Sequence, residues 1–255
     1  MQVCDVQGHW RRDWLRAPGV EDRATCVNWM QCGALYADIR IPACRPETRG
    51  ATSLADLSSA ALLKVMRAEG FAGEITLSGD VCTWKREIDW HGPAKAPDTG
   101  KLEFTSEDSL LETGVAADYT EQWQRTDTVA DGALRLSCGE WLGFLVTVGE
   151  RFVFGTGPSG ARDAGTSAAV MTALEAGRRD EAALAAHFES AYVFGRWHRG
   201  SGVAIQATNP LLEGEKVLTC NGKGVAFEHI AYDGKRKRLN FVPSTTEKTM
   251  SAVVA

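Results

Sequence analysis

Tryptophans alternate with arginines and a glutamate in four short stretches of the first half of this chain. In "YTEQWQR" (119–125) the threonine and glutamines fall on one face of an extended strand, and the tyrosine, glutamate, tryptophan and arginine fall on the other. The same reasoning in "GHWRRDWL", "CVNWMQC" and "CTWKREIDWH" predicts one shared inward face. Its predicted members are Trp10, Arg12, Trp14, Trp29, Gln31, Trp84, Arg86, Trp90, Tyr119, Glu121, Trp123 and Arg125.

This set of residues predicts either a ligand pocket or a paired structural core. Buried arginine and glutamate are costly unless each is paired. Aromatic walls with a guanidinium would suit a small ligand that carries a carboxylate, enolate or phosphate. In the structural alternative, tryptophans fill the ends of a barrel and a Glu–Arg pair closes a gap.

An enzyme is the second interpretation of the same residues. Glu121, Tyr119 and Arg86 are then the candidate catalytic residues, and the remaining members of the inward set bind the ligand. Glu121 would act as general acid or base with a pKa raised by desolvation, while an arginine fixes a substrate carboxylate.

In the neighbouring stretch "LYADIRIP" (35–42), apolar residues alternate with polar ones, so the charged side chains are expected on the outer face of the strand. Leu35, Ala37, Ile39 and Ile41 are predicted to be buried. Asp38 and Arg40 are then predicted to form an ion pair at the surface, although a bulge near Gly33 would reverse the two faces.

The elements that must hold these residues are strands in two similar series. Period-2 alternation predicts eight strands within 6–125, near 6–15, 22–32, 34–41, 73–79, 81–90, 101–105, 108–113 and 117–125. A second series of eight falls near 132–138, 141–148, 151–156, 193–199, 202–207, 215–220, 224–231 and 236–241. Helical spacing follows the third strand of each series, at 53–69 and at 164–191.

Eight antiparallel strands of this length close into a barrel that can enclose one small ligand. We therefore expect a mainly β protein with two tandem eight-stranded antiparallel barrels, each with a helical insertion after its third strand. Residues 1–130 would form the N-terminal barrel with the ligand cavity, and residues 131–255 a filled, structural C-terminal barrel. One large β-sandwich with inserted helices is the competing architecture.

Three resemblances accompany this layout. Gly8-His9-Trp10 resembles the G-x-W signature of the lipocalin barrel, and with the paired series the chain resembles the Hri family of double lipocalin-like barrels. The resemblance implies the fold, and an arginine late in the barrel packed over Trp10, for which Arg125 is the candidate. The tyrosine, arginine and glutamate types also resemble those of phenolic acid decarboxylase barrels.

Composition and motifs exclude several classes of function. A net charge of −5 gives no reason to expect nucleic acid, and no apolar stretch is long enough for a membrane helix. Seven cysteines without a C-x-x-C pair, and five scattered histidines, predict neither a disulfide framework nor a metal site, and they suit the cytoplasm. No cofactor is expected. The sequence neither predicts nor excludes the formation of a homodimer.

Three local features receive structural interpretations. Gly155-x-Gly157-x-x-Gly160 matches a dinucleotide fingerprint, but its hairpin context predicts a flexible connector at a barrel rim. The basic run 235–238 is predicted to be a solvated strand edge, and His198 a surface residue at a strand end.

The sequence thus leaves three functions open. The first is a cytoplasmic lipocalin-like protein that binds a small aromatic or acidic molecule in its N-terminal barrel. The second is a cofactor-free lyase, decarboxylase or isomerase in the same cavity, and the third is a protein-interaction scaffold.

Overall fold

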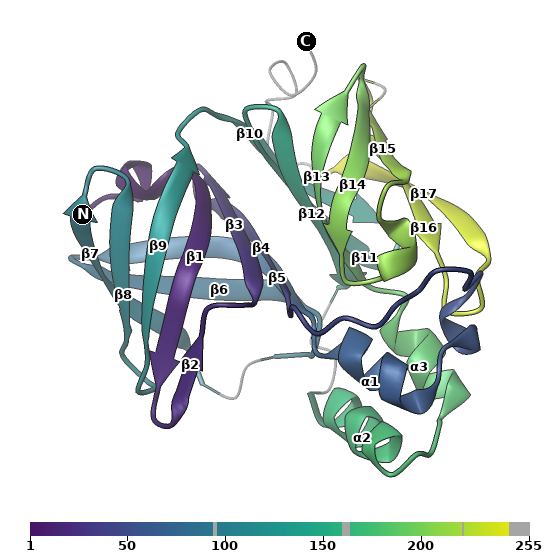
Figure 1. Ribbon diagram of the computed structural model, residues 1–255. Coiled ribbons are helices and arrows are strands. Elements are labelled where there is room, and N and C mark those ends of the chain that lie inside the picture. Colours follow the sequence, from purple (N-terminus) through teal and green to yellow (C-terminus); the bar gives the residue numbers. More distant parts are fainter. Residues whose placement is uncertain (94–95, 160–163, 221, 245–255) are drawn as a thin grey trace.

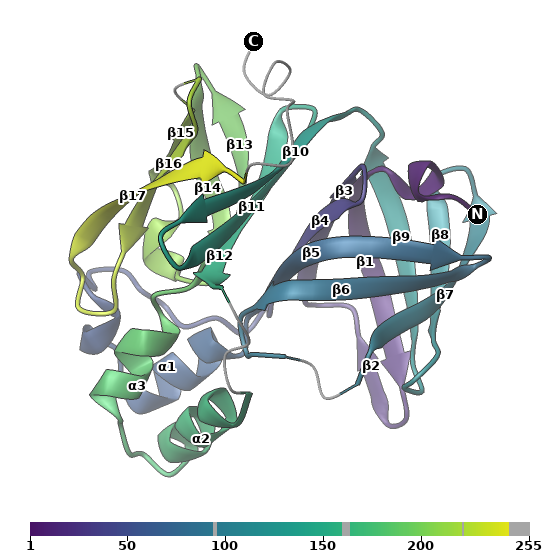
Figure 2. The same cartoon turned by 180° about the vertical axis from the view of Figure 1, so that it is seen from behind.

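The protein folds into two β-barrels that lie side by side, with the helices grouped at one end of the C-terminal barrel (Figures 1 and 2). The structure is a computed structural model, and it describes residues 1–93, 96–159, 164–220 and 222–244. Within these residues each barrel closes with eight antiparallel strands, which confirms the predicted fold class.

The N-terminal barrel closes where its first strand pairs with its last. The short strand β2 forms a hairpin with the end of β1 and lies outside the closed ring. The strands are β1 (Gly8–Ala17), β2 (Val20–Asp22), β3 (Cys26–Cys32), β4 (Leu35–Ile41), β5 (Glu69–Ser78), β6 (Val81–Asp89), β7 (Asp98–Ser106), β8 (Ser109–Gly114) and β9 (Thr120–Asp127).

The C-terminal barrel follows after a two-residue connection and closes through β10 and β17. Its interior is filled by aromatic rings: Phe154 lies 4.9 Å from Phe227 and 5.6 Å from Phe241, between ring centroids. The strands are β10 (Ala130–Cys138), β11 (Trp141–Val148), β12 (Arg151–Pro158), β13 (Ala191–His198), β14 (Ser201–Ala207), β15 (Lys216–Cys220), β16 (Val225–Ile230) and β17 (Arg236–Pro243).

The helices follow the third strand of each closed ring, as the sequence predicts. Helix α1 (Ser59–Met66) comes after β4, and its N-terminus is capped by the Ser58 side chain. Helices α2 (Ala164–Glu175) and α3 (Glu181–His187) come after β12. Among the described residues, none of the helices has the length and hydrophobicity that crossing a membrane requires.

The largest apolar cluster lies between the barrels and under the helices. The outer faces of β3 and β4 pack against β10, β11 and β12, so that Leu35, Ala37, Ile39 and Ile41 are buried outside the N-terminal barrel. The ring of Tyr192 fits against Gly70 and Gly155, where a Cβ atom would lie within 2.5 Å of the ring. This packing fixes which face of β4 is left for the barrel interior.

Two of the local expectations need correction or refinement. Residues 155–158 are not a flexible connector: they are part of β12, which pairs antiparallel with both β11 and β13, and Gly160 lies outside the described residues. The basic run is exposed, and each of its side chains is paired with a carboxylate, from Lys235–Asp233 through Arg238–Glu228. His198 is exposed at the end of β13, as expected.

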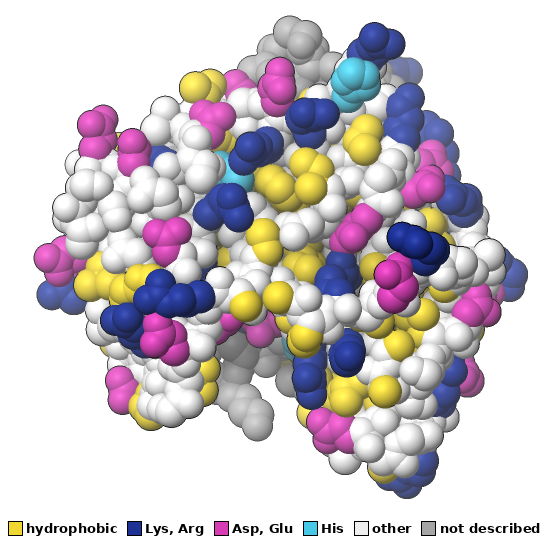
Figure 3. All heavy atoms as spheres, viewed as in Figure 1, with side chains coloured by type: hydrophobic (Ala, Val, Ile, Leu, Met, Phe, Trp, Pro, Cys, Tyr) yellow, Lys and Arg dark blue, Asp and Glu magenta, His cyan; other side chains and the backbone are white. Residues whose placement is uncertain are grey.

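On the face of the molecule seen in Figure 3, basic and acidic side chains are interspersed rather than gathered by sign.

Candidate functional site

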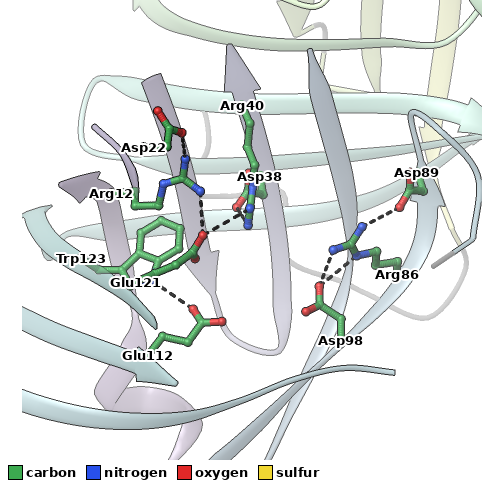
Figure 4. A network of polar contacts seen from close by, with 10 residues as sticks. All are labelled: Arg12, Asp22, Asp38, Arg40, Arg86, Asp89, Asp98, Glu112, Glu121 and Trp123. Carbon is green, nitrogen blue, oxygen red and sulfur yellow. Dashed lines mark hydrogen bonds and ion pairs between the residues drawn. The ribbon is translucent and has the colours of Figure 1, made fainter. Parts of the chain in front are cut away.

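A cavity of about 240 Å³ lies inside the N-terminal barrel. Aromatic side chains form one part of its wall, and an ion-pair network forms another (Figure 4). The lining residues are Leu15, Trp29, Asp38, Arg40, Phe71, Trp84, Arg86, Asp98, Glu112, Tyr119, Glu121 and Trp123.

Half of the predicted inward set lines this cavity. Trp29 packs edge to face against both Trp84 and Trp123, with ring centroids 5.8 and 5.6 Å apart. All three rings are at least nine-tenths buried. The other predicted members that line it are Arg86, Tyr119 and Glu121.

Trp14 does not point into the barrel as predicted. A β-bulge in β1 makes Asp13 an extra residue, because Arg12 pairs with Trp123 while Trp14 pairs with Gln122. After the bulge, Leu15 takes the inward position opposite Glu121. Trp14 instead packs under Arg16 on the outer face.

Trp90 is displaced in the same way by a bulge in β6. Gly73 pairs with Arg86 and Ala72 with Ile88, so Glu87 is the extra residue. Asp89 therefore points inward beside Arg86, and Trp90 turns outward. The Trp90 ring packs between the barrels, 4.3 Å from the ring of His187.

Four more of the predicted members, Trp10, Arg12, Gln31 and Arg125, lie outside the cavity lining. The Arg125 guanidinium stacks over the Trp10 ring at 4.6 Å, as the lipocalin resemblance implies, and donates to the backbone oxygens of Asp5, Gln7 and Glu107. Gln31 is buried and donates to the Gly33 carbonyl.

Arg12 and Arg40 hold a chain of carboxylates along one wall of the cavity. Arg12 lies 2.6 Å from Glu121 and 2.5 Å from Asp22, and Arg40 lies 3.6 Å from Glu121 and 3.2 Å from Asp38. The predicted Asp38–Arg40 pair exists, but its surface position is wrong, because Asp38 is only 3% exposed. The outer face of β4 is covered by the C-terminal barrel, so its polar face turns inward.

Arg86 forms a second cluster on the opposite side of the network in Figure 4. Its guanidinium lies 2.6 Å from Asp98 and 2.8 Å from Asp89, and stacks 3.6 Å from the centre of the Phe71 ring. Arg86 is thus fully engaged rather than a lone charge awaiting an anion.

Glu112 is the candidate that sequence reasoning missed. It lies on β8 and is 4% exposed. Its carboxyl accepts hydrogen bonds from the Tyr119 hydroxyl at 2.6 Å and the Trp123 indole at 3.0 Å. Alternation with Leu110, two residues earlier and fully buried, was the signal that could have placed it inside the barrel.

Burial shifts the pKa values of the ionisable side chains in the cavity wall. Desolvation, followed by repulsion from Glu121, raises the pKa of Glu112 to about 8. Desolvation also raises the pKa of Asp38 to about 6, although Arg40 partly offsets it. Burial alone would lower the pKa of Arg86, but Asp98 and Asp89 outweigh it and raise that pKa.

Comparisons of this chain with protein-family models, curated proteins and solved structures give no match. Among the described residues, His, Cys, Asp and Glu side chains do not form a group of three or more that could hold a metal ion.

Proposed function

We propose that this protein binds a small organic molecule inside its N-terminal barrel. The proposal rests on a cavity inside the barrel whose wall combines tryptophan rings with carboxyl groups, one of which accepts hydrogen bonds from Tyr119 and Trp123. Its volume of about 240 Å³ is below the ~300–1,000 Å³ of typical ligand pockets, so the ligand is small. The paired barrels and the Arg125–Trp10 stack support the proposed relationship to the Hri family of double lipocalin-like barrels.

The proposed location is the cytoplasm. The seven cysteines, all among the described residues, form no disulfide bond with one another, which is typical of proteins in a reducing compartment.

Tryptophan fluorescence tests this proposal directly. A panel of small aromatic amines, acids and alcohols should contain compounds that change the emission in a saturable way, with one site per chain by calorimetry. Trp84→Phe, which alters the cavity wall, should reduce the signal and the affinity, whereas Trp14→Phe on the outer face of β1 should leave the affinity unchanged. A panel without a single saturable binder, or equal effects of both variants, would count against binding in this cavity.

A cofactor-free lyase or isomerase in the same cavity is a second candidate, favoured by one observation. Glu112 has a raised pKa and a phenol hydroxyl in direct contact, which suits general acid–base chemistry near neutral pH. Glu121, the base predicted from the sequence, is engaged by Arg12 and is the weaker candidate. Turnover of a bound compound that is lost in Glu112→Gln, while binding persists, would favour the enzyme over the carrier.

The scaffold interpretation gains no support from the basic run, since each of its cations already faces a carboxylate.

A further inference from the structure

The charges around the cavity are unbalanced toward carboxylates. The network drawn in Figure 4 holds more carboxyl groups than arginines. Each arginine is shared between two carboxylates, as Arg12 is between Asp22 and Glu121. The guanidiniums are therefore already occupied, and an acidic ligand would have to compete with buried partners for them.

Glu112 is the exception in this network. Within the part of the chain that the structure describes, its carboxyl group has no ion-pair partner, and it is held by the neutral donors Tyr119 and Trp123. Gly100 on the neighbouring strand leaves room for it, because a Cβ atom there would lie 2.8 Å from the Glu112 side chain. This buried carboxyl group at the cavity wall has no cation of its own.

The aromatic wall suits a cation as well. The faces of tryptophan rings attract ammonium and guanidinium groups, most strongly where water is excluded. Trp29, Trp84 and Trp123 line the cavity and are 1%, 7% and 2% exposed, so a cation beside their rings would be largely shielded from water.

We infer that the ligand is a small organic cation, an aromatic amine in particular, whose ammonium group is bound by Glu112 beside the rings of Trp29, Trp84 and Trp123. This inference rests on the proposed function and replaces the acidic ligand expected from the sequence with a basic one. The ammonium would convert the protonated Glu112 to a carboxylate, so that binding releases a proton from the protein.

The groups that set this proton equilibrium come from several strands. Glu121 on β9 and Asp98 on β7 disfavour ionisation of Glu112, while Arg40 on β4 and the Tyr119 hydroxyl favour it. Cys82 on β6 also interacts with Glu112, and its own pKa is raised chiefly by burial. A cation bound next to Glu112 would act against the two acidic neighbours.

A matched set of compounds separates this inference from the proposed function. Calorimetry with 2-phenylethylamine, 2-phenylethanol and 3-phenylpropanoate tests one aromatic body with a positive, neutral or negative group. We expect the amine to bind at least about tenfold more tightly than the acid, since a charge-assisted hydrogen bond is lost otherwise. The heat of binding should depend on the ionisation enthalpy of the buffer, as proton release requires.

The matched variants are Glu112→Gln and Glu103→Gln, the latter an exposed glutamate on β7. A glutamine can keep both contacts, accepting from Trp123 and donating to Tyr119, so the fold should persist by circular dichroism. Glu112→Gln should weaken amine binding about tenfold or more and leave the alcohol within about threefold, while Glu103→Gln changes neither.

Benzyltrimethylammonium keeps its charge at every pH. It therefore tests whether binding of a cation is coupled to the loss of a proton from Glu112. Its affinity should rise by up to about tenfold per pH unit from pH 6 towards 8, and this dependence should vanish in Glu112→Gln. Tighter binding of the acid, or equal amine binding in both variants, would overturn the inference while leaving small-molecule binding intact. If the amine, the alcohol and the acid all fail to bind, the proposed function falls as well.

Discussion

Glu112 on β8 and Glu121 on β9 lie directly opposite one another on neighbouring antiparallel strands, with both side chains at the wall of the cavity. Two like charges in this register repel, and burial strengthens the repulsion. The structure relieves it unequally: Glu121 is held by Arg12 and Arg40, while Glu112 is left with neutral donors. Glu112 therefore has a raised pKa, of about 8, because burial and the neighbouring Glu121 both disfavour its ionised form.

This asymmetry predicts that stability falls as pH rises from about 6.5 to about 8. The pKa of Glu112 is about 8 in the folded protein and 4.5 when unperturbed, so the folded state binds more protons in this interval. The free energy of unfolding should decrease by up to ~1.4 kcal/mol per pH unit. Below about 6.5, His9 and His229, with pKa values lowered by burial to about 4, act in the opposite sense.

Urea denaturation at pH 6.5, 7.25 and 8 measures this slope. Glu112→Gln should flatten it, whereas Glu103→Gln should keep it. A slope that is the same in Glu112→Gln and in the wild type would show that another group is responsible.

Arg12 should be essential for stability, because Glu121 is buried beside it. The Arg12 and Glu121 side chains are 4% and 2% exposed, and removing one partner leaves a buried charge. Arg12→Met should lower the free energy of unfolding by ~3 kcal/mol, and adding Glu121→Gln should recover part of the loss. Arg11→Met, an exposed change on the same strand, should cost less than ~0.5 kcal/mol in the same urea titration. Equal costs for the two single variants would refute this account.

Alternation in the sequence was enough to predict the strands, because each strand of a closed barrel has one inner and one outer face. It was not enough to predict which side chains point into the barrel along the whole length of a strand. The bulges at Asp13 and Glu87 shift the register by one residue, and they move Trp14 and Trp90 out of the predicted site. Neither bulge contains a glycine that would mark it in the sequence.

The predicted orientation of β4 was wrong for a different reason. Ile39 and its apolar neighbours are buried by the C-terminal barrel rather than by their own, so the usual rule of apolar side chains facing inward is reversed. Asp38 and Arg40 therefore enter the cavity. The pairing of each arginine also depends on strands far apart in the chain, which a single sequence does not specify.

Arg125 should stabilise the end of the barrel where β1 begins, without affecting the ligand. It stacks on Trp10 and donates to three backbone carbonyls, and it does not line the cavity. Arg125→Lys keeps the charge but loses the planar stacking and the forked donors, so we expect a loss of ~1–2 kcal/mol. Thermal unfolding should show this loss, and the affinity for any cavity ligand should stay unchanged. Weakened binding with an unaltered melting temperature would return Arg125 to the ligand-binding set predicted from the sequence.

The glycines of "FGTGPSG" should differ sharply in their tolerance of alanine. A Cβ atom on Gly155 would lie 2.5 Å from the buried ring of Tyr192, whereas one on Gly157 would lie 3.4 Å from the Ser190 hydroxyl oxygen, an ordinary contact. Gly155→Ala should therefore destabilise the protein by ~1–3 kcal/mol through overpacking between the barrels, and Gly157→Ala by much less. Combining Gly155→Ala with Tyr192→Leu should recover part of the loss, because the smaller side chain makes room. Urea denaturation of the four proteins, wild type included, distinguishes this packing role from a loop that tolerates both substitutions equally.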